Sequence, residues 1–419
     1  MNTKSLEKCE PAPKRLHRYL LLPLGLVAII VGFGGVVLLL RHGKPLDPDA
    51  VWGQAQEQLH SEQIDAAESS LRRLTLLRKP TVLDWLLRAQ VAMARSRTDE
   101  ALDDLKQIKD DPKIGAQARL MMGQLELRRK RLRYAENYLL SALELDPKLV
   151  PAHRELIYIY GIQLRRRALN EQFHALAELT PLTYDNVFHW CLTRNSIWEP
   201  LELSQMMENF IKTDPDDRWS RISLAECLRT LGKKDEAEKV LGYLPDSDPD
   251  ARVVRVRLAL DRGDDKLAES LLADGPPDHA ELARLRGRMA LAHKDAASAL
   301  KHFRLAMAVE PDNRDAIFGL SGALAMLGEK DEAEKYRKLA KDHDMLGSLM
   351  QRASTPTERN NPTLLQELGA ACEAIHRLAE ARSWYNLVIT RDPLNKEAQQ
   401  SIYRVNAAIA ESQKRKSQG

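Results

Sequence analysis

Prolines recur along this chain at an interval of 34 residues. One series comprises Pro147, Pro181, Pro215 and Pro249, and a second series with the same interval ends at Pro311. A proline ends a helix because it lacks the backbone N–H and its ring clashes with the preceding turn. A fixed interval of this length indicates a repeat architecture, in which each unit buries its apolar face only against its neighbours. The sequence therefore predicts one continuous array of small repeated units.

The stretch from Ala280 to Asn313 defines the unit most clearly. Apolar residues recur at helical spacing on both sides of a polar turn at 293–295, and Pro311 follows the second of these helices. Gly287 and Ala299 lie one in each helix, where two antiparallel helices would cross closely and only small side chains fit. Each unit is thus predicted to be a helix, a turn and a second helix.

This unit resembles the tetratricopeptide repeat, whose pattern has a small residue at position 8, Ala at 20, an aromatic residue at 24, Ala at 27 and Pro at 32. The residues that carry the pattern in three units are Gly123, Ala135 and Pro147; Gly287, Ala299, Phe303, Ala306 and Pro311; and Gly369, Ala381, Tyr385 and Pro393. The resemblance implies an all-α, right-handed superhelix of about ten helix-turn-helix repeats. It also implies a non-catalytic protein that binds partners in a concave groove.

The register of the repeats sets the expected domain boundaries. Six units of 34 residues are expected at Pro48–Thr81, Val82–Gly115, Ala116–Leu149, Val150–Thr183, Tyr184–Asp217 and Arg218–Ala251. A shortened unit at Arg252–His279, units at Ala280–Asn313 and Arg314–Gly347, a polar insertion at Ser348–Asn361, a unit at Pro362–Asn395, a capping helix at 396–414 and a tail at 415–419 follow.

Two neighbouring units, over residues 150–217, depart from the pattern. The positions for small residues hold Ile157 and Leu169 in the first of them, and Cys191 and Leu203 in the second. Larger side chains at these positions are expected to widen the gap between the paired helices and to change the curvature of the superhelix. The sequence marks this region as a specialised one.

An apolar run precedes the repeats. Tyr19–Leu40 contains 22 residues without a charge, enough for a helix to cross about 30 Å of hydrocarbon. Its length and the absence of a small-residue cleavage site predict a retained transmembrane anchor. Five basic residues in the N-terminal segment 1–18, against two in the following twenty residues, place that segment in the cytoplasm. The array, which begins after a linker at 41–47, is then expected on the periplasmic or extracytoplasmic side.

Composition and motifs exclude several classes of function. The 63 basic and 60 acidic residues give a net charge of +3, which disfavours nucleic acid as a partner. Cys9, Cys191, Cys227 and Cys372 are far apart in the sequence and form no CxxC motif, so neither a metal site nor a disulfide framework is expected. No HExxH or nucleophile-elbow motif occurs, and Ser321 is interpreted as a small packing residue. The chain is predicted to be neither an enzyme nor a cofactor-binding protein.

Two sets of residues are candidates for binding. In the family that the chain resembles, positions 5 and 9 of the first helix line the groove, and the candidates at these positions are Arg154, Tyr158, Phe188, Arg284 and Arg288. They form neither a carboxylate clamp nor an asparagine ladder, which leaves helix-in-groove binding or surface docking. The second set is a basic edge at successive turns, formed by Arg128, Arg129, Arg131, Arg165, Arg166 and Arg167. This edge is either simply solvated or a contact for anionic lipid or an acidic partner.

The resemblance favours a membrane-anchored scaffold that helps to assemble a bacterial envelope complex. One alternative is an anchored adaptor with its repeats in the cytoplasm, which the bias of basic residues opposes. Another is an organelle import receptor, which the missing carboxylate clamp opposes. The identity of the protein partner stays open.

Overall fold

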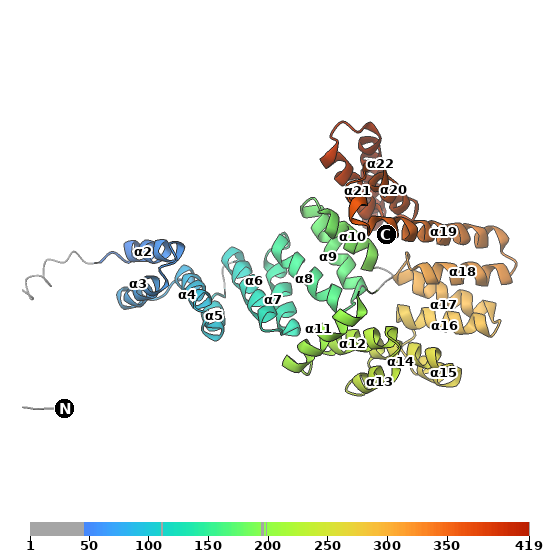
Figure 1. Cartoon of the computed structure of the whole chain (residues 1–419), viewed down its shortest axis with the longest axis horizontal. Coiled ribbons are helices and arrows are strands. Elements are labelled where there is room, and N and C mark those ends of the chain that lie inside the picture. The colour runs from blue at the N-terminus through green and yellow to red at the C-terminus, as the bar shows by residue number, and fades with distance from the viewer. Residues whose placement is uncertain (1–45, 110–111, 194–196, 198, 419) are drawn as a thin grey trace, which may run out of the picture. The chain divides into compact units, whose positions relative to one another are not determined.

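The computed structural model describes residues 46–109, 112–193, 197 and 199–418. Helices dominate these residues, and no strand occurs among them. The chain divides into two compact units, the first ending at Asp104 and the second beginning at Leu105 (Figure 1). The predicted all-α solenoid is confirmed.

The first unit contains two helix pairs. Its helices are α2 (Pro48–His60), α3 (Ile64–Leu77), α4 (Val82–Ala94) and α5 (Thr98–Leu105), whose last residue belongs to the second unit. Thr81 and Asp84 form a capping box at the start of α4, which satisfies backbone N–H groups that have no partner inside the helix. Arg78 donates two hydrogen bonds to the Asp84 carboxylate, at 2.6 and 3.0 Å, and so fixes the turn between the pairs.

The second unit continues the same arrangement. Its first ten helices are α6 (Pro112–Arg128), α7 (Leu132–Leu145), α8 (Val150–Ile162), α9 (Arg166–Leu179), α10 (Tyr184–Thr193), α11 (Pro200–Thr213), α12 (Arg218–Thr230), α13 (Lys234–Leu241), α14 (Pro249–Arg262) and α15 (Asp265–Ala273). The remainder are α16 (Ala280–Ala292), α17 (Ala296–Val309), α18 (Arg314–Met326), α19 (Lys330–Ala353), the 3-10 turn Pro356–Glu358, α20 (Pro362–Ala374), α21 (Leu378–Arg391) and α22 (Lys396–Gln418).

Glycines allow the paired helices to approach closely. A Cβ atom at Gly369 would lie 2.4 Å from Cε1 of Tyr385, and one at Gly123 would lie 2.7 Å from Cγ of Leu139. The ring of Phe303 fills the space beside Gly287, at 2.9 Å from such a Cβ. Phe303 lies one turn after Ala299 in α17, so its ring also occupies this crossing, beside the predicted small pair of Gly287 and Ala299.

Two of the observed helices begin before the expected boundaries of their units. α6 begins at Pro112 and not at Ala116, and α14 begins at Pro249 and not at Arg252. The Asp248 side chain accepts hydrogen bonds from two backbone N–H groups of the first turn of α14, so this aspartate sets where the helix starts.

The expected polar insertion at 348–361 is also partly wrong. α19 continues through Ala353, because Leu346, Leu349, Met350 and Ala353 repeat at helical spacing and are all buried. Only the residues after this helix form the irregular connection to α20.

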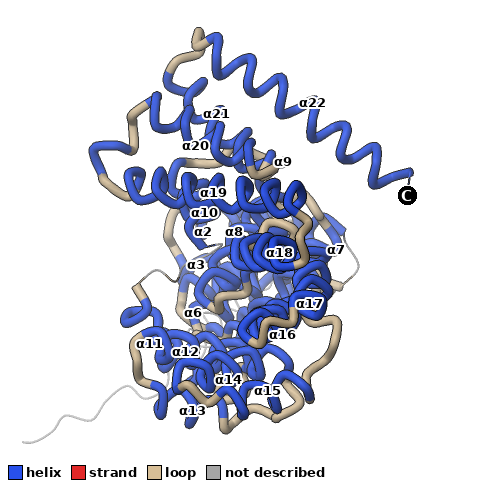
Figure 2. The backbone as a smooth tube through the Cα atoms, turned by 90° about the vertical axis from the view of Figure 1, so that its right-hand side faces the viewer, coloured by secondary structure: helices blue, strands red, loops and turns tan. Residues whose placement is uncertain are grey.

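The second unit closes into a ring. α10 packs on α21 and α19, whereas α11, its expected partner, packs on α12. Figures 1 and 2 show α9 and α10 beside the layers of α19, α20 and α21. The small-residue position held by Cys191 therefore faces a distant repeat, and residues 150–217 are where the array meets its own C-terminal repeats. The adjacent pair α8 and α9 stays packed despite Ile157 and Leu169.

The predicted transmembrane segment Tyr19–Leu40 lies outside the described residues. Of the helices within the described ranges, none combines the length and apolar character that crossing a bilayer requires.

Candidate functional site

The ring of the second unit surrounds a cavity of about 2070 Å³. Its walls come from α9, α12, α14, α16, α18, α19, α21 and α22, so helices from the whole ring contribute to it. Pockets for small molecules usually have volumes of about 300–1,000 Å³ and mainly apolar walls. This cavity is larger and its walls are rich in charge, which suits a polypeptide segment better than a small apolar ligand.

Alternating charges connect successive first helices along one wall. Arg257 of α14 bridges Glu226 of α12 at 2.8 Å and Glu281 of α16 at 3.1 Å. Arg284 then bridges Glu281 at 2.6 Å and Asp315 of α18 at 3.5 Å. These pairs lie at related positions of consecutive repeats, so the stacking of the helices brings them together. The wall is consequently held by ion pairs that cross from one repeat to the next.

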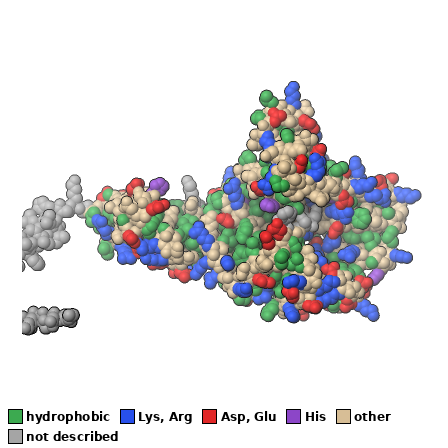
Figure 3. Space-filling model, in the orientation of Figure 1, with side chains coloured by type: hydrophobic (Ala, Val, Ile, Leu, Met, Phe, Trp, Pro, Cys, Tyr) green, Lys and Arg blue, Asp and Glu red, His purple; other side chains and the backbone are tan. Residues whose placement is uncertain are grey.

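The carboxylates of this wall stay charged. Burial alone would raise the pKa values of Glu226 and Glu281. The guanidinium of Arg257, together with Arg229 at Glu226 and Arg284 at Glu281, outweighs burial and lowers both pKa values. The wall therefore presents fixed charges of both signs at neutral pH. Figure 3 shows the same mixture of acidic and basic side chains over one face of the second unit.

Arg166 differs from the other arginines of the cavity. It is the first residue of α9 and lines the cavity, where burial and the nearby cation of Arg257 lower the pKa of its guanidinium. No hydrogen bond or ion pair to its guanidinium occurs among the described residues. The carboxylates of Glu281, Glu226 and Glu310 act on this cation without forming an ion pair and do not outweigh burial and Arg257, so an anionic group of a ligand would stabilise it further.

The remaining lining arginines each have a carboxylate partner. Besides the pairs of Arg257 and Arg284, the pairs are Arg165–Glu136 at 2.7 Å, Arg167–Glu171 at 3.2 Å, Arg314–Asp344 at 3.0 Å and Arg377–Asp312 at 3.3 Å. Arg166 is therefore the lining guanidinium that, within the described part of the chain, has none.

An aromatic side chain of the cavity lining is held between two arginines. Trp219 lines the cavity, and the guanidinium carbons of Arg165 and Arg218 lie 4.7 and 4.2 Å from its ring centre. Arg165 also lies 4.4 Å from the ring centre of Tyr160, which is buried as expected for a core residue. Trp219 and Arg166 therefore contribute an aromatic surface and a positive charge to the same cavity.

The opposite wall contains His343 of α19. Its side chain is buried, and its Nε2 atom has no hydrogen-bond partner. Burial, together with the nearby cation of Arg377, lowers the pKa of His343 to about 4. The imidazole is therefore neutral at physiological pH.

The five groove candidates from the sequence do not form one surface. Arg284 lines the cavity, whereas Arg154, Tyr158 and Arg288 are exposed at positions outside its lining. Phe188 is 7% exposed and stacks on Tyr184 in the core, so its predicted contact role is wrong. The departure of α10 from α11 turned this side chain inward.

The six arginines of the predicted basic edge also separate. Arg128 and Arg167 are exposed, whereas Arg129 and Arg131 are partly buried and lie within 4 Å of the buried Glu126. Arg165 packs against aromatic rings, and Arg166 faces the cavity. A single exposed edge of six charges is thus wrong, because α9 turns its first residues toward the inside of the ring.

Sequence reasoning missed Arg257, His343 and Trp219 as cavity residues. With the unit started at Pro249, Arg257 falls on the ninth position of its first helix, as Glu226 does in the unit before. The sequence therefore contains this regularity, but a unit that starts at Arg252 does not place Arg257 at the ninth position.

Comparisons with known proteins agree with the repeats. Residues 290–353 match the model of the tetratricopeptide repeat family, so the predicted resemblance is confirmed for this stretch. A search of the curated proteins finds no match. Among solved structures, a tetratricopeptide repeat protein from Parabacteroides merdae has 16% identity and a TM-score of 0.32, covering 58% of this chain and 98% of its own. A chain of the APC/C Cut9–Hcn1 hetero-tetramer has 12% identity and a TM-score of 0.31, covering 86% and 96%.

Proposed function

We propose that this chain is a non-catalytic scaffold whose ring cavity holds a segment of a partner protein, with an acidic group of that segment at Arg166. The observation that carries the proposal is the unpaired Arg166 guanidinium in a cavity of about 2070 Å³ whose other arginines are paired. Trp219 would supply apolar contact area in the same cavity. A hydrogen-bonded ion pair in such a site contributes about 1.5–3 kcal/mol, or roughly ten- to a hundredfold in affinity.

The proposal also includes the membrane. The apolar run Tyr19–Leu40 supports a single anchor, and the basic residues before it support a periplasmic or extracytoplasmic array that helps to assemble an envelope complex. A reporter that is active only in the cytoplasm, fused after Gly419, should then be silent. An active reporter on an intact chain would favour the cytoplasm-facing adaptor, or an import receptor on an organelle surface.

Binding by the cavity is tested with peptides on the full chain in detergent. Pools of labelled peptides of equal length would contain either Asp and Glu or the corresponding amides Asn and Gln. The acidic pool should bind more tightly, and Arg166→Gln should weaken its binding about tenfold or more while leaving the amide pool unchanged. Arg288→Gln is the matched control, because this arginine is exposed and lies outside the lining of the cavity.

The location is tested with a photo-reactive residue. Placed at Ala175 on the cavity wall, it should crosslink the bound acidic peptide, whereas the same residue at the exposed Phe318, outside the lining, should not. Crosslinking from position 318 alone would reject the cavity as the binding site. Equal binding of both pools would reject the role of Arg166.

Contact with anionic lipid is a weaker second function. Of the six arginines predicted for it, Arg128 and Arg167 are exposed, and surface cations of this kind contribute about 1 kcal/mol each near a charged membrane. Vesicles with and without anionic lipid, at low and physiological salt, distinguish such a contact from a solvated surface.

A further inference from the structure

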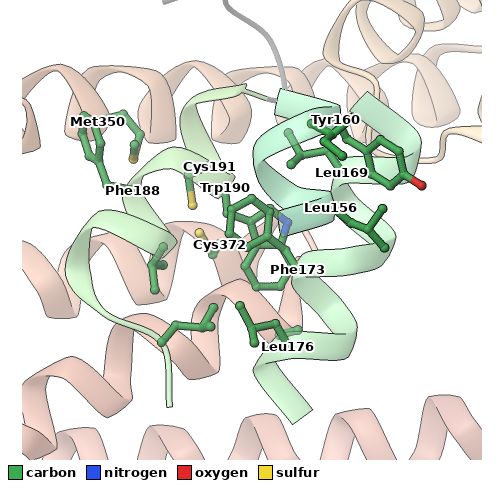
Figure 4. Close-up of a cluster of buried hydrophobic side chains, with 14 of the residues drawn as sticks. Leu156, Tyr160, Leu169, Phe173, Leu176, Phe188, Trp190, Cys191, Met350 and Cys372 are labelled. Atoms are coloured by element: carbon green, nitrogen blue, oxygen red, sulfur yellow. The ribbon is translucent and has the colours of Figure 1, made fainter. Parts of the chain in front are cut away.

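Two cysteines that are far apart in the sequence lie close together in the core of the second unit. Cys191 lies in α10 and Cys372 in α20, 181 residues later, and both are buried. Their sulfur atoms and a carboxylate oxygen of Glu380 all lie within 4.8 Å of one another. Figure 4 shows the two sulfur atoms side by side, with Phe188 and Met350 nearby. We infer that Cys191 and Cys372 form a disulfide that locks the closed ring.

Polar and charged groups surround these two sulfur atoms. Cys191 Sγ donates a hydrogen bond to Glu380 Oε2 at 3.1 Å, and the indole Nε1 of Trp384 donates one to Cys191 Sγ at 3.3 Å. The guanidinium of Arg377 lies 3.7 Å from the Glu380 carboxylate. In the closed ring burial, together with the Glu380 carboxylate, raises the pKa of Cys191 and keeps its thiol protonated, whereas the indole N–H donor favours negative charge on the sulfur. Apolar packing of two cysteines would require none of these groups.

The geometry favours a disulfide over a metal ion. A structural zinc site has four ligands, and Cys191, Cys372 and Glu380 supply three in the described part of the chain. The cation of Arg377 also lies against the third of them and would repel a metal ion. A disulfide needs only the two sulfurs, which must approach to about 2.05 Å.

The bond would form by thiol–disulfide exchange with a disulfide oxidant, R–S–S–R. In the open ring the Cys191 thiol gives its proton to solvent, and the thiolate attacks one sulfur of the oxidant, forming a mixed disulfide and expelling R–S⁻, which takes up a proton from solvent. Cys372, as a thiolate, then attacks Cys191 Sγ, forming the Cys191–Cys372 bond and expelling a second R–S⁻, which takes the Cys372 proton. Two electrons have then passed from the cysteine pair to the oxidant, which leaves as two thiols.

Burial determines when this reaction can occur. Burial in the closed ring raises the pKa of Cys191 well above its ordinary value, and an external disulfide cannot reach the buried sulfur. The first step therefore belongs to an open ring, with α10 away from α21. Closure of the ring then brings Cys372 to the mixed disulfide. The second step can therefore occur only after the repeats have packed against each other. The inference is independent of the ligand of the cavity.

The test counts thiols in the full chain in detergent. The reduced protein is unfolded, refolded with oxidised glutathione, denatured and labelled with a maleimide that adds a fixed mass. Of its four cysteines, two should be labelled after oxidation and four after reduction. A peptide containing both Cys191 and Cys372 should appear in the digest of the unreduced sample.

Matched variants separate this pair from the other cysteines. Cys191→Ser keeps a hydroxyl that can bond to Glu380, and it should show three labelled thiols in both samples. Cys227→Ser removes a buried cysteine of α12 and should still lose two thiols on oxidation, leaving one. Hydrogen exchange of α10 should be at least about tenfold slower in the oxidised wild type than in the reduced one.

Two results would overturn the inference. One is a wild-type chain that keeps Cys191 and Cys372 both labelled after refolding with oxidised glutathione. The other is one equivalent of zinc in the purified chain that is lost in Cys191→Ser, since a metal site would then explain the three converging groups.

Discussion

The hydroxyl of Tyr184, the first residue of α10, donates a hydrogen bond of 2.7 Å to the backbone carbonyl of Ala353, the last residue of α19. Carbonyls in the last turn of a helix have no partner within that helix. Tyr184 therefore satisfies such a group 169 residues away and joins the two ends of the ring. Its ring also lies edge-on to Trp384 of α21, at 5.6 Å between centres.

Tyr184→Phe should loosen the closure of the ring. The aromatic contacts would remain, but the Ala353 carbonyl would lose its partner, at a cost of about 1 kcal/mol. Amides in the last turn of α19 and in α10 should exchange with solvent faster, as measured by hydrogen exchange. Tyr403→Phe, at an exposed tyrosine of α22, is the control and should change neither helix. Unchanged exchange in both variants would show that this hydrogen bond does not hold the ring.

Gly319→Ala should destabilise α17 and α18. Its new Cβ would lie 2.2 Å from Cζ of Phe303, and overpacking of this kind costs about 1–3 kcal/mol. Gly347→Ala in α19 is the matched control, because nothing lies within 4 Å of a Cβ there and alanine favours a helix by about 1 kcal/mol. In denaturant unfolding, the free energy of unfolding should therefore fall in Gly319→Ala and rise in Gly347→Ala. If both variants changed the free energy of unfolding in the same direction, the Phe303 ring would be able to move aside at little cost.

The repeats could be predicted because their signals are local. Helices α8, α10, α12, α16, α18 and α20 begin at the residues where the 34-residue register begins its units. Small residues such as Gly123 and Gly369 do lie at close helix crossings. Each of these features depends on residues fewer than about 20 positions apart, which is the range that a repeat pattern describes.

Closure of the ring could not be predicted in this way. It depends on contacts such as Cys191 with Trp384 and Tyr184 with Ala353, between residues that share no period. In the unit Tyr184–Asp217 the sequence shows Cys191 at the position for a small residue. This residue indicates only that α10 lacks its ordinary partner helix, and it does not identify the helix that replaces it. The cavity followed from the closure, so Arg166 could not be distinguished from the exposed arginines beside it.

Arg257→Gln should destabilise the second unit strongly. Arg257 is 19% exposed and separates Glu226 from Glu281, which would face each other without it. Removing one partner from such a network should cost about 2–3 kcal/mol, the lower end for buried pairs because some solvent reaches it. Arg167→Gln breaks an exposed pair and should stay within about 0.5 kcal/mol in the same unfolding experiment. Similar losses in the two variants would contradict the structural role of the wall.

His343 should make the second unit less stable as the pH falls from about 6.5 to about 4. Burial and the cation of Arg377 lower its pKa to about 4 in the folded chain, with Arg314 acting in the same direction and Asp312 and Asp344 opposing. In the unfolded chain the His343 imidazole therefore binds a proton near pH 6.5, whereas in the folded chain it does so only near pH 4. The stability is fully present above pH 6.5, and a shift of this size corresponds to roughly 3 kcal/mol over the window.

The His343 contribution is separated from that of the carboxylates by comparing slopes. Glu226 and Glu281, whose pKa values are also lowered, remain in His343→Gln and keep their own acid dependence. The variant should therefore lose only the part of the slope between pH 6.5 and 4 that His343 causes, in denaturant unfolding at several pH values. His293→Gln, at an exposed histidine, should keep the wild-type slope. A wild-type slope in His343→Gln would mean that the buried imidazole takes up its proton in the folded chain as readily as in the unfolded one.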